Sequence, residues 1–158
     1  MKSHITSVVG VLLVLSLALA NGASGAKIKS ISFCEQVSED GMVPINVTSR
    51  FGTDAPSVHA VIDMEGVKKG MVVRGVWISV DAIETPDYEI DAAEAVAASK
   101  DAVIHFALSR PDNGWPAGNY KLDVYVGGDF ALSAPFRVLG GSDSEKPAAK
   151  KTTRKKTA

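Results

Sequence analysis

The chain has 158 residues, a single cysteine and a formal net charge of −1 at pH 7. One cysteine excludes an intrachain disulfide, and no segment after the N-terminus is apolar enough to span a bilayer. The near-neutral total hides a strong asymmetry. Residues 27–140 carry ten Lys and Arg against sixteen Asp and Glu, a net of −6, whereas residues 141–158 carry six cations against two acids, a net of +4.

The N-terminus predicts a secretory signal peptide over residues 1–26. Lys2 precedes an apolar run of about thirteen residues, and small residues then give two cleavage patterns, at 18–20 and at 24–26. The run is shorter than the roughly 20 residues that a transmembrane helix needs. We therefore expect a protein that is secreted or periplasmic after cleavage, with no transmembrane segment.

Residues 27–140 predict one all-β domain. Short segments alternate apolar and polar residues, and clusters of Gly, Pro, Asp and Asn separate them. In chain order we expect strands at 28–34, 43–51, 58–64, 71–80, 103–109, 120–126 and 130–138. About seven strands is the number typical of an immunoglobulin-like, two-sheet antiparallel sandwich.

The last two of these strands form the clearest unit, a hairpin. Gly127 and Gly128 supply a two-residue turn between them. Strict alternation then places Phe130 and Phe136 on the same, core-facing side of the last strand. Pro135 cannot donate a hydrogen bond to a neighbouring strand, which predicts that this strand lies at a sheet edge or carries a bulge.

Residues 81–101 contain seven acids and allow two interpretations. Asp91, followed three residues later by Glu94, resembles a capping box and predicts one or two helical turns over 92–99. An irregular strand fits the same segment nearly as well. The sequence leaves both open.

Residues 115–120 read Trp-Pro-Ala-Gly-Asn-Tyr and precede an alternating strand. This segment resembles the tyrosine corner of immunoglobulin-like and fibronectin type III-like sandwiches, which implies that the Tyr120 hydroxyl bonds back across the preceding turn. Trp77 is placed like the core tryptophan of an immunoglobulin strand C, although the paired cysteines of true immunoglobulin domains are missing. We expect Trp77, Trp115 and Tyr120 to be structural.

The chain also resembles uncharacterised bacterial periplasmic domains. These open with a Cys-Glu-x-Val segment, here residues 34–37, and close with a Trp-Gly-Tyr hairpin. The resemblance covers nearly the whole domain, and it implies a fold and a compartment but no activity.

The C-terminal segment, residues 141–158, consists largely of Ala, Thr and Lys, with one Pro, and has no large apolar residue, so we expect it to be disordered. One interpretation is a flexible polycation that contacts an anionic envelope polymer, a membrane surface or extracellular DNA. The other is a solvated tail that only aids solubility. The cations of this basic segment are Lys146, Lys150, Lys151, Arg154, Lys155 and Lys156.

The sequence offers one alternative site, for copper or zinc. Parity points His59 and His105 outward from strands that are neighbours in an immunoglobulin-like sheet, and Cys34 could face outward on the adjoining strand. The competing interpretation is that these three residues occupy scattered surface and core positions and form no site.

The chain contains none of the common catalytic or nucleotide-binding motifs, so we expect no enzyme and no cofactor. The expected protein is an exported, non-catalytic binding or accessory domain of the cell envelope. Its protein partner, if it has one, is unknown from the sequence.

Overall fold

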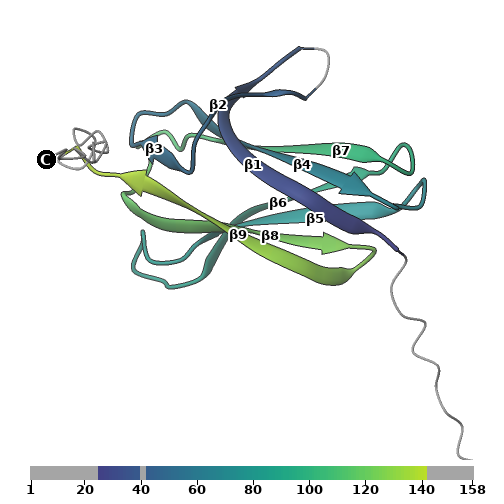
Figure 1. The fold of residues 1–158 in the computed structure, drawn as a ribbon. Helices are drawn as coiled ribbons and strands as arrows, with labels where there is room; N and C mark the ends of the chain where they lie inside the picture. The colour runs from purple at the N-terminus through teal and green to yellow at the C-terminus, as the bar shows by residue number, and fades with distance from the viewer. Residues whose placement is uncertain (1–24, 40–41, 142–158) are drawn as a thin grey trace, which may run out of the picture.

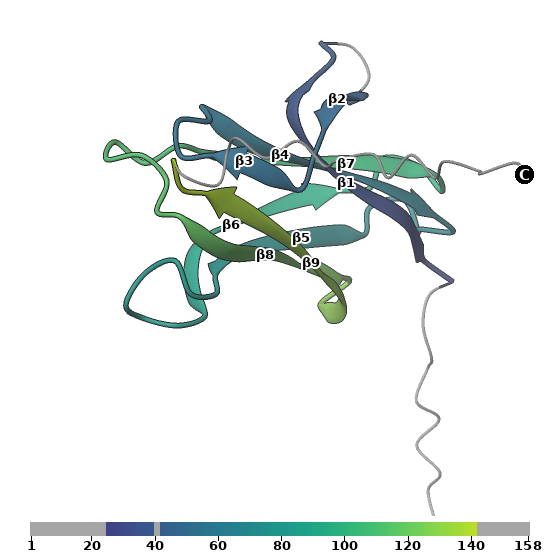
Figure 2. The same cartoon turned by 60° about the vertical axis from the view of Figure 1, so that its left-hand side comes forward.

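The computed structural model describes residues 25–39 and 42–141, which form nine strands in two facing sheets (Figure 1). One sheet has the strand order β2-β1-β4-β7, and the other has the order β3-β9-β8-β5-β6. Figure 2 shows the two sheets as separate layers. The strands are β1 (Lys27–Val37), β2 (Pro44–Val47), β3 (Arg50–Gly52), β4 (Ser57–Glu65), β5 (Val72–Ser79), β6 (Tyr88–Val96), β7 (Ala102–Ser109), β8 (Gly118–Val126) and β9 (Asp129–Leu139).

The described residues contain no helix, and the predicted all-β, immunoglobulin-like sandwich is confirmed. Within the described ranges the structure also has no helix with the length and apolarity needed to cross a bilayer. The strand pairs are antiparallel with one exception. β3 runs parallel to β9, with Arg50 opposite Arg137 and Gly52 opposite Leu139.

The prediction of one strand over residues 43–51 is wrong, because this segment forms two strands that belong to different sheets. β2 pairs with β1, and β3 pairs with β9. The chain changes sheet at Thr48 and Ser49. The Thr48 hydroxyl accepts a hydrogen bond from the Arg50 amide at 3.0 Å and donates one to the Arg50 carbonyl at 2.9 Å. These local bonds compete with a continuous strand and bend the backbone.

An aromatic cluster fills the space between the sheets. The Phe136 ring lies 5.0 Å from Phe33 of the opposite sheet, and 5.9, 5.8 and 5.3 Å from Phe51, Trp77 and Tyr120, measured between ring centroids. All five side chains are buried. Aromatic pairs at these separations contribute about 0.5–1.5 kcal/mol each beyond the burial of their area. The cluster therefore joins the two sheets, and Trp77 is part of the core as predicted.

The predicted tyrosine corner is present. The Tyr120 hydroxyl donates a hydrogen bond to the Pro116 carbonyl at 2.7 Å, across the turn that precedes β8. Trp115 packs edge-on against Tyr120 and donates its indole N–H to the Ala55 carbonyl at 2.7 Å. Burial, with a smaller contribution from the charge of Asp81, raises the pKa of Tyr120 to about 12. The hydroxyl therefore stays protonated and can donate at neutral pH.

The β8–β9 hairpin has the predicted two-residue turn. Val126 pairs with Asp129, and the φ angles of Gly127 and Gly128 are 63° and 94°. Both values lie in the left-handed region that glycine adopts without strain.

The prediction that Phe130 faces the core is wrong. Val124 pairs with Leu132 but the next residue, Tyr125, pairs with Phe130, so Ala131 is an extra residue in β9. A bulge of this kind reverses the alternation. Phe130 therefore lies against Tyr125 outside the sandwich and is 58% exposed. The bulge, and the free edge of β9 beside Pro135 where β3 does not extend, agree with the prediction drawn from that proline.

Of the two interpretations of residues 81–101, the irregular strand is confirmed and the helix is wrong. β6 pairs with β5 along its length. Trp77 pairs with Asp91 and Ile78 with Glu89, which leaves Ile90 as an extra residue. Ala93 and Ala95 pack against the core, so pairing and burial outweigh the weak helical signal at Asp91.

Candidate functional site

The basic segment lies outside the described residues, so its six cations are known from the sequence alone. Its point of attachment is described. β9 ends at Leu139, and β1 begins at Lys27 at the opposite end of the sandwich (Figure 1). Gly140 lies beside Ala117 of the segment that leads into β8. The basic segment therefore leaves the body at the end that carries the tyrosine corner.

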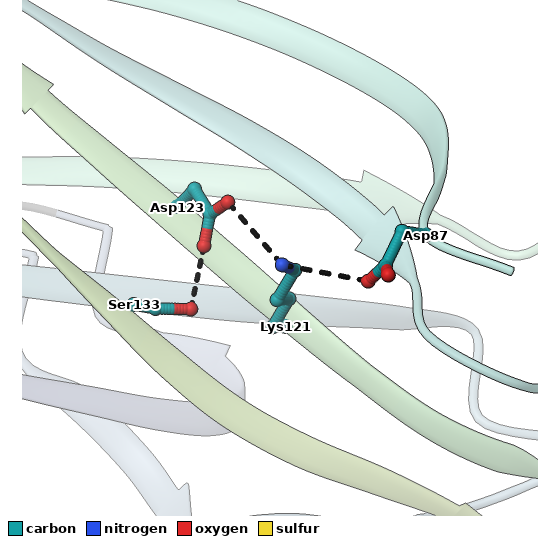
Figure 3. Close-up of polar contacts among 4 residues, drawn as sticks. All are labelled: Asp87, Lys121, Asp123 and Ser133. Atoms are coloured by element: carbon teal, nitrogen blue, oxygen red, sulfur yellow. Dashed lines mark hydrogen bonds and ion pairs between the residues drawn. The ribbon is translucent and has the colours of Figure 1, made fainter. Parts of the chain in front are cut away.

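The outer face of the five-stranded sheet carries a polar cluster built around Lys121 (Figure 3). The Lys121 ammonium lies 3.5 Å from an oxygen of Asp87 and 3.6 Å from an oxygen of Asp123. The second oxygen of Asp123 accepts a hydrogen bond from the Ser133 hydroxyl at 2.5 Å. Asp123 is only 8% exposed, so it needs this cation and this donor. The cluster connects β8, β9 and the loop before β6, which is a structural role.

The same outer face has a hollow of about 640 Å³. Val76 and Ile78 supply apolar side chains, and the Arg74 guanidinium lies 3.9 Å from the Glu89 carboxylate. This hollow offers apolar contact and a neutralised charge pair. It is lined by Val72, Arg74, Val76, Ile78, Glu89, Glu94, Tyr125 and Gly128.

The four-stranded sheet brings two of the three predicted metal ligands together on its outer face. β4 and β7 are neighbours, and His105 of β7 lies diagonally from His59 of β4. His59 Nδ1 is 2.9 Å from His105 Nε2, and the two ring planes are 16° apart. His59 Nε2 is 2.8 Å from the hydroxyl of Ser57. The side chains thus form a chain of contacts from Ser57 through His59 to His105.

Cys34 lies directly opposite His59 in the register of β1 and β4, but its side chain is fully buried. Burial raises the pKa of the Cys34 thiol, against smaller opposing effects of backbone hydrogen bonds from Ile45 and Gln36. Within the described residues, no three or more His, Cys, Asp and Glu side chains are arranged to hold a metal ion. The structure therefore assembles the two histidines, and the thiol is not grouped with them.

Both imidazoles favour the neutral form. Burial lowers the pKa of His59 below its ordinary value of 6.5, and the charge of His105 lowers it further. Burial also lowers the pKa of His105. A neutral imidazole has one nitrogen lone pair free for a proton or a metal ion.

Ser57 was not among the candidates that the sequence provided. The predicted strand began one residue later, at residue 58, whereas β4 begins at Ser57. The spacing of two residues between Ser57 and His59 puts both side chains on one face of a strand, and that spacing is the signal that could have found it.

No known protein family matches the sequence, and no curated protein is similar to it in sequence. An immunoglobulin-like protein from Pseudomonas aeruginosa has a similar structure, with 13% identity, a TM-score of 0.46, and coverage of 75% of this chain and 100% of its own. A β-glucosidase from Listeria innocua matches 73% of this chain at 13% identity and a TM-score of 0.45, over 16% of its own length. An alkylpurine DNA glycosylase from Pseudomonas fluorescens matches 74% at 16% identity and a TM-score of 0.44, over 31% of its own length.

These likenesses concern the sandwich fold alone, and this chain spans less than a third of the length of either enzyme. The strand order and the tyrosine corner define the class of the described domain, which is an immunoglobulin-like β-sandwich.

Proposed function

We propose that the protein is an exported, non-catalytic binding or accessory domain of the cell envelope, whose basic segment contacts anionic polymers or surfaces. The observation that carries the proposal is the separation of charge, with a net of −6 over residues 27–140 and a net of +4 over residues 141–158. An anionic envelope polymer, a membrane surface and extracellular DNA share the chemistry that such a segment recognises.

The ion pairs within residues 27–140 support the proposal that the basic segment, and not the sandwich, contacts the polyanion. Lys27 lies 3.8 Å from Glu65, and Lys29 lies 3.3 Å from Asp63. Lys121 lies between two carboxylates. Cations that are already paired with acids attract a polyanion weakly, and the excess of acids repels it. The basic segment is therefore the part of the chain suited to the contact.

Counterion release provides the driving force for this contact. Each phosphate or sulfate that a lysine or arginine neutralises releases condensed counterions, so binding weakens steeply as salt is added. Exposed ion pairs contribute little by themselves, and the sum over several cations gives the affinity.

The test uses the full chain with the six cations of the basic segment replaced by glutamine. We expect the native chain to be retained on immobilised heparin and on DNA at low salt and released as salt rises, and the glutamine variant to pass through. A matched control keeps the composition of residues 141–158 but shuffles their order, and it should bind like the native chain. Equal retention of the glutamine variant would show that the basic segment is not the binding element.

A further inference from the structure

The contact between His59 and His105 brings two candidate metal ligands together. His59 Nδ1 lies 2.9 Å from His105 Nε2, which is the length of a direct N–H···N hydrogen bond between the two rings. Imidazole nitrogens bind zinc or copper at about 2.0–2.1 Å, so one ion that replaces the shared proton can reach both nitrogens when the rings turn toward it. Among divalent first-row ions, nitrogen ligands bind Cu²⁺ most tightly.

We propose that His59 and His105 form a two-histidine site for Cu²⁺ on the outer face of the four-stranded sheet, with His59 Nδ1 and His105 Nε2 as the protein ligands. β4 and β7 run side by side in the upper layer of Figure 1, and their antiparallel pairing from Ser57 to Met64 holds the two backbones in fixed register. Both imidazoles are half-buried, so water can fill the remaining positions around the ion.

Ser57 positions one of the ligands. For His59 to bind metal through Nδ1, its proton must be on Nε2, from which it donates to the Ser57 hydroxyl at 2.8 Å. One of the two facing nitrogens carries a proton in the metal-free pair. When that proton is on His105 Nε2, binding of Cu²⁺ moves it to Nδ1 of the same ring, so both ligands stay neutral and no proton is lost.

The ligand set is two histidines and does not include Cys34. The thiol is opposite His59 in register but is fully buried, and among the described residues it is not grouped with the two histidines in an arrangement that could hold a metal ion. This site is remote in sequence from the basic segment and does not depend on the function proposed for that segment.

The test is Cu²⁺ binding to the chain from Lys27 to Ala158, because residues 1–26 are expected to be cleaved, followed by calorimetry and by pulsed electron paramagnetic resonance, which counts coordinated imidazoles. We expect one Cu²⁺ with two imidazoles. His59→Gln and His105→Gln should each weaken binding at least tenfold and leave one imidazole in the spectrum. Ser57→Ala should weaken binding by about tenfold, as substitutions of groups behind a metal ligand do. The thermal unfolding midpoint of each variant checks that it folds.

Further controls sharpen this result. His4 lies within the predicted signal peptide and is absent from the tested chain, so His59 and His105 are its remaining histidines, and Cys34→Ser should leave Cu²⁺ affinity unchanged. Zn²⁺ should bind more weakly than Cu²⁺, because divalent copper binds nitrogen ligands more tightly than zinc does. The proposal is overturned by a spectrum with a single imidazole in the native chain, by loss of affinity in Cys34→Ser, or by Zn²⁺ binding as tight as Cu²⁺. The glutamine variant of the basic segment should bind Cu²⁺ normally, which keeps this test separate from that of the polyanion contact.

Discussion

The aromatic interior and the basic segment of this chain depend on different physical effects. The interior is determined by shape and by a few hydrogen bonds, as the rings around Phe136 and the bond from Tyr120 to Pro116 illustrate. The contact proposed for the basic segment depends on charge alone, since this segment has no large apolar residue that could pack against a partner. The stability of the fold and the proposed polyanion contact therefore depend on separate parts of the chain. Substitutions should therefore change one property and leave the other intact.

The largest effect should come from Phe136→Ala. This ring contacts four others across both sheets, so its loss leaves a cavity and should reduce the free energy of unfolding by about 3–5 kcal/mol. Phe130→Ala is the matched control on the same strand. It removes an exposed ring and should cost about 1 kcal/mol or less. Urea unfolding measures both, and similar losses would mean that Phe130 belongs to the core after all.

Gly75→Ala should destabilise the fold by about 1–3 kcal/mol through overpacking. A β-carbon at this position would lie 2.8 Å from Phe106 and 3.2 Å from Leu122, inside normal contact distance. Phe106→Leu should partly relieve the crowding, so the double variant should be more stable than the sum of the two single effects implies. Simple additivity in urea unfolding would contradict the close approach of the two sheets at this point.

Tyr120→Phe should cost about 1 kcal/mol, because it removes the hydroxyl that bonds to Pro116 and leaves that carbonyl without its donor. Tyr125→Phe on the outer face of the same strand is the control and should change stability by less than about 0.5 kcal/mol. Retention on heparin should be the same for both folded variants. An unchanged unfolding midpoint for Tyr120→Phe would argue against the corner.

The smallest effect should be the dependence of stability on pH below neutrality. The pKa values of His59 and His105 are lower in the folded state than their ordinary value of 6.5, so the unfolded chain binds protons more readily. This contribution is fully present above about pH 6.5 and is lost as the pH falls through the folded-state pKa values. Native protein should therefore lose more stability between pH 7 and pH 5 than the double variant His59→Gln, His105→Gln. If the native protein and the double variant lost stability equally over this pH range, the lowered pKa values of His59 and His105 would be contradicted.

Features set by a few consecutive residues could be predicted from the sequence. The corner follows from the short segment around Trp115 and Tyr120, and the hairpin turn follows from Gly127 and Gly128. Alternation along each strand, together with the strand order of an immunoglobulin-like sheet, placed His59 and His105 on one outer face, and the structure brings them into contact. In each case the physical determinant is a local backbone preference or the alternation of side chains along an uninterrupted strand.

Features that depend on pairing between distant segments could not be predicted. Extra residues at Ile90 and Ala131 reverse the alternation, and the sequence does not give their positions. Pro135 predicts a sheet edge or a bulge in the last strand but does not locate the bulge at Ala131. The change of sheet at Thr48 depends on where β1 and β9 offer free edges. Whether Cys34 would be buried or exposed likewise depends on the strands on either side of it.

The salt dependence of DNA binding tests the central claim most directly. If the basic segment alone makes the contact through its six cations, the logarithm of the association constant for double-stranded DNA should fall with the logarithm of salt concentration with a slope no steeper than about −5. Replacing three of the six cations with glutamine should roughly halve the slope, and replacing all six should bring binding close to zero. A slope that stays the same when all six are replaced would contradict the account.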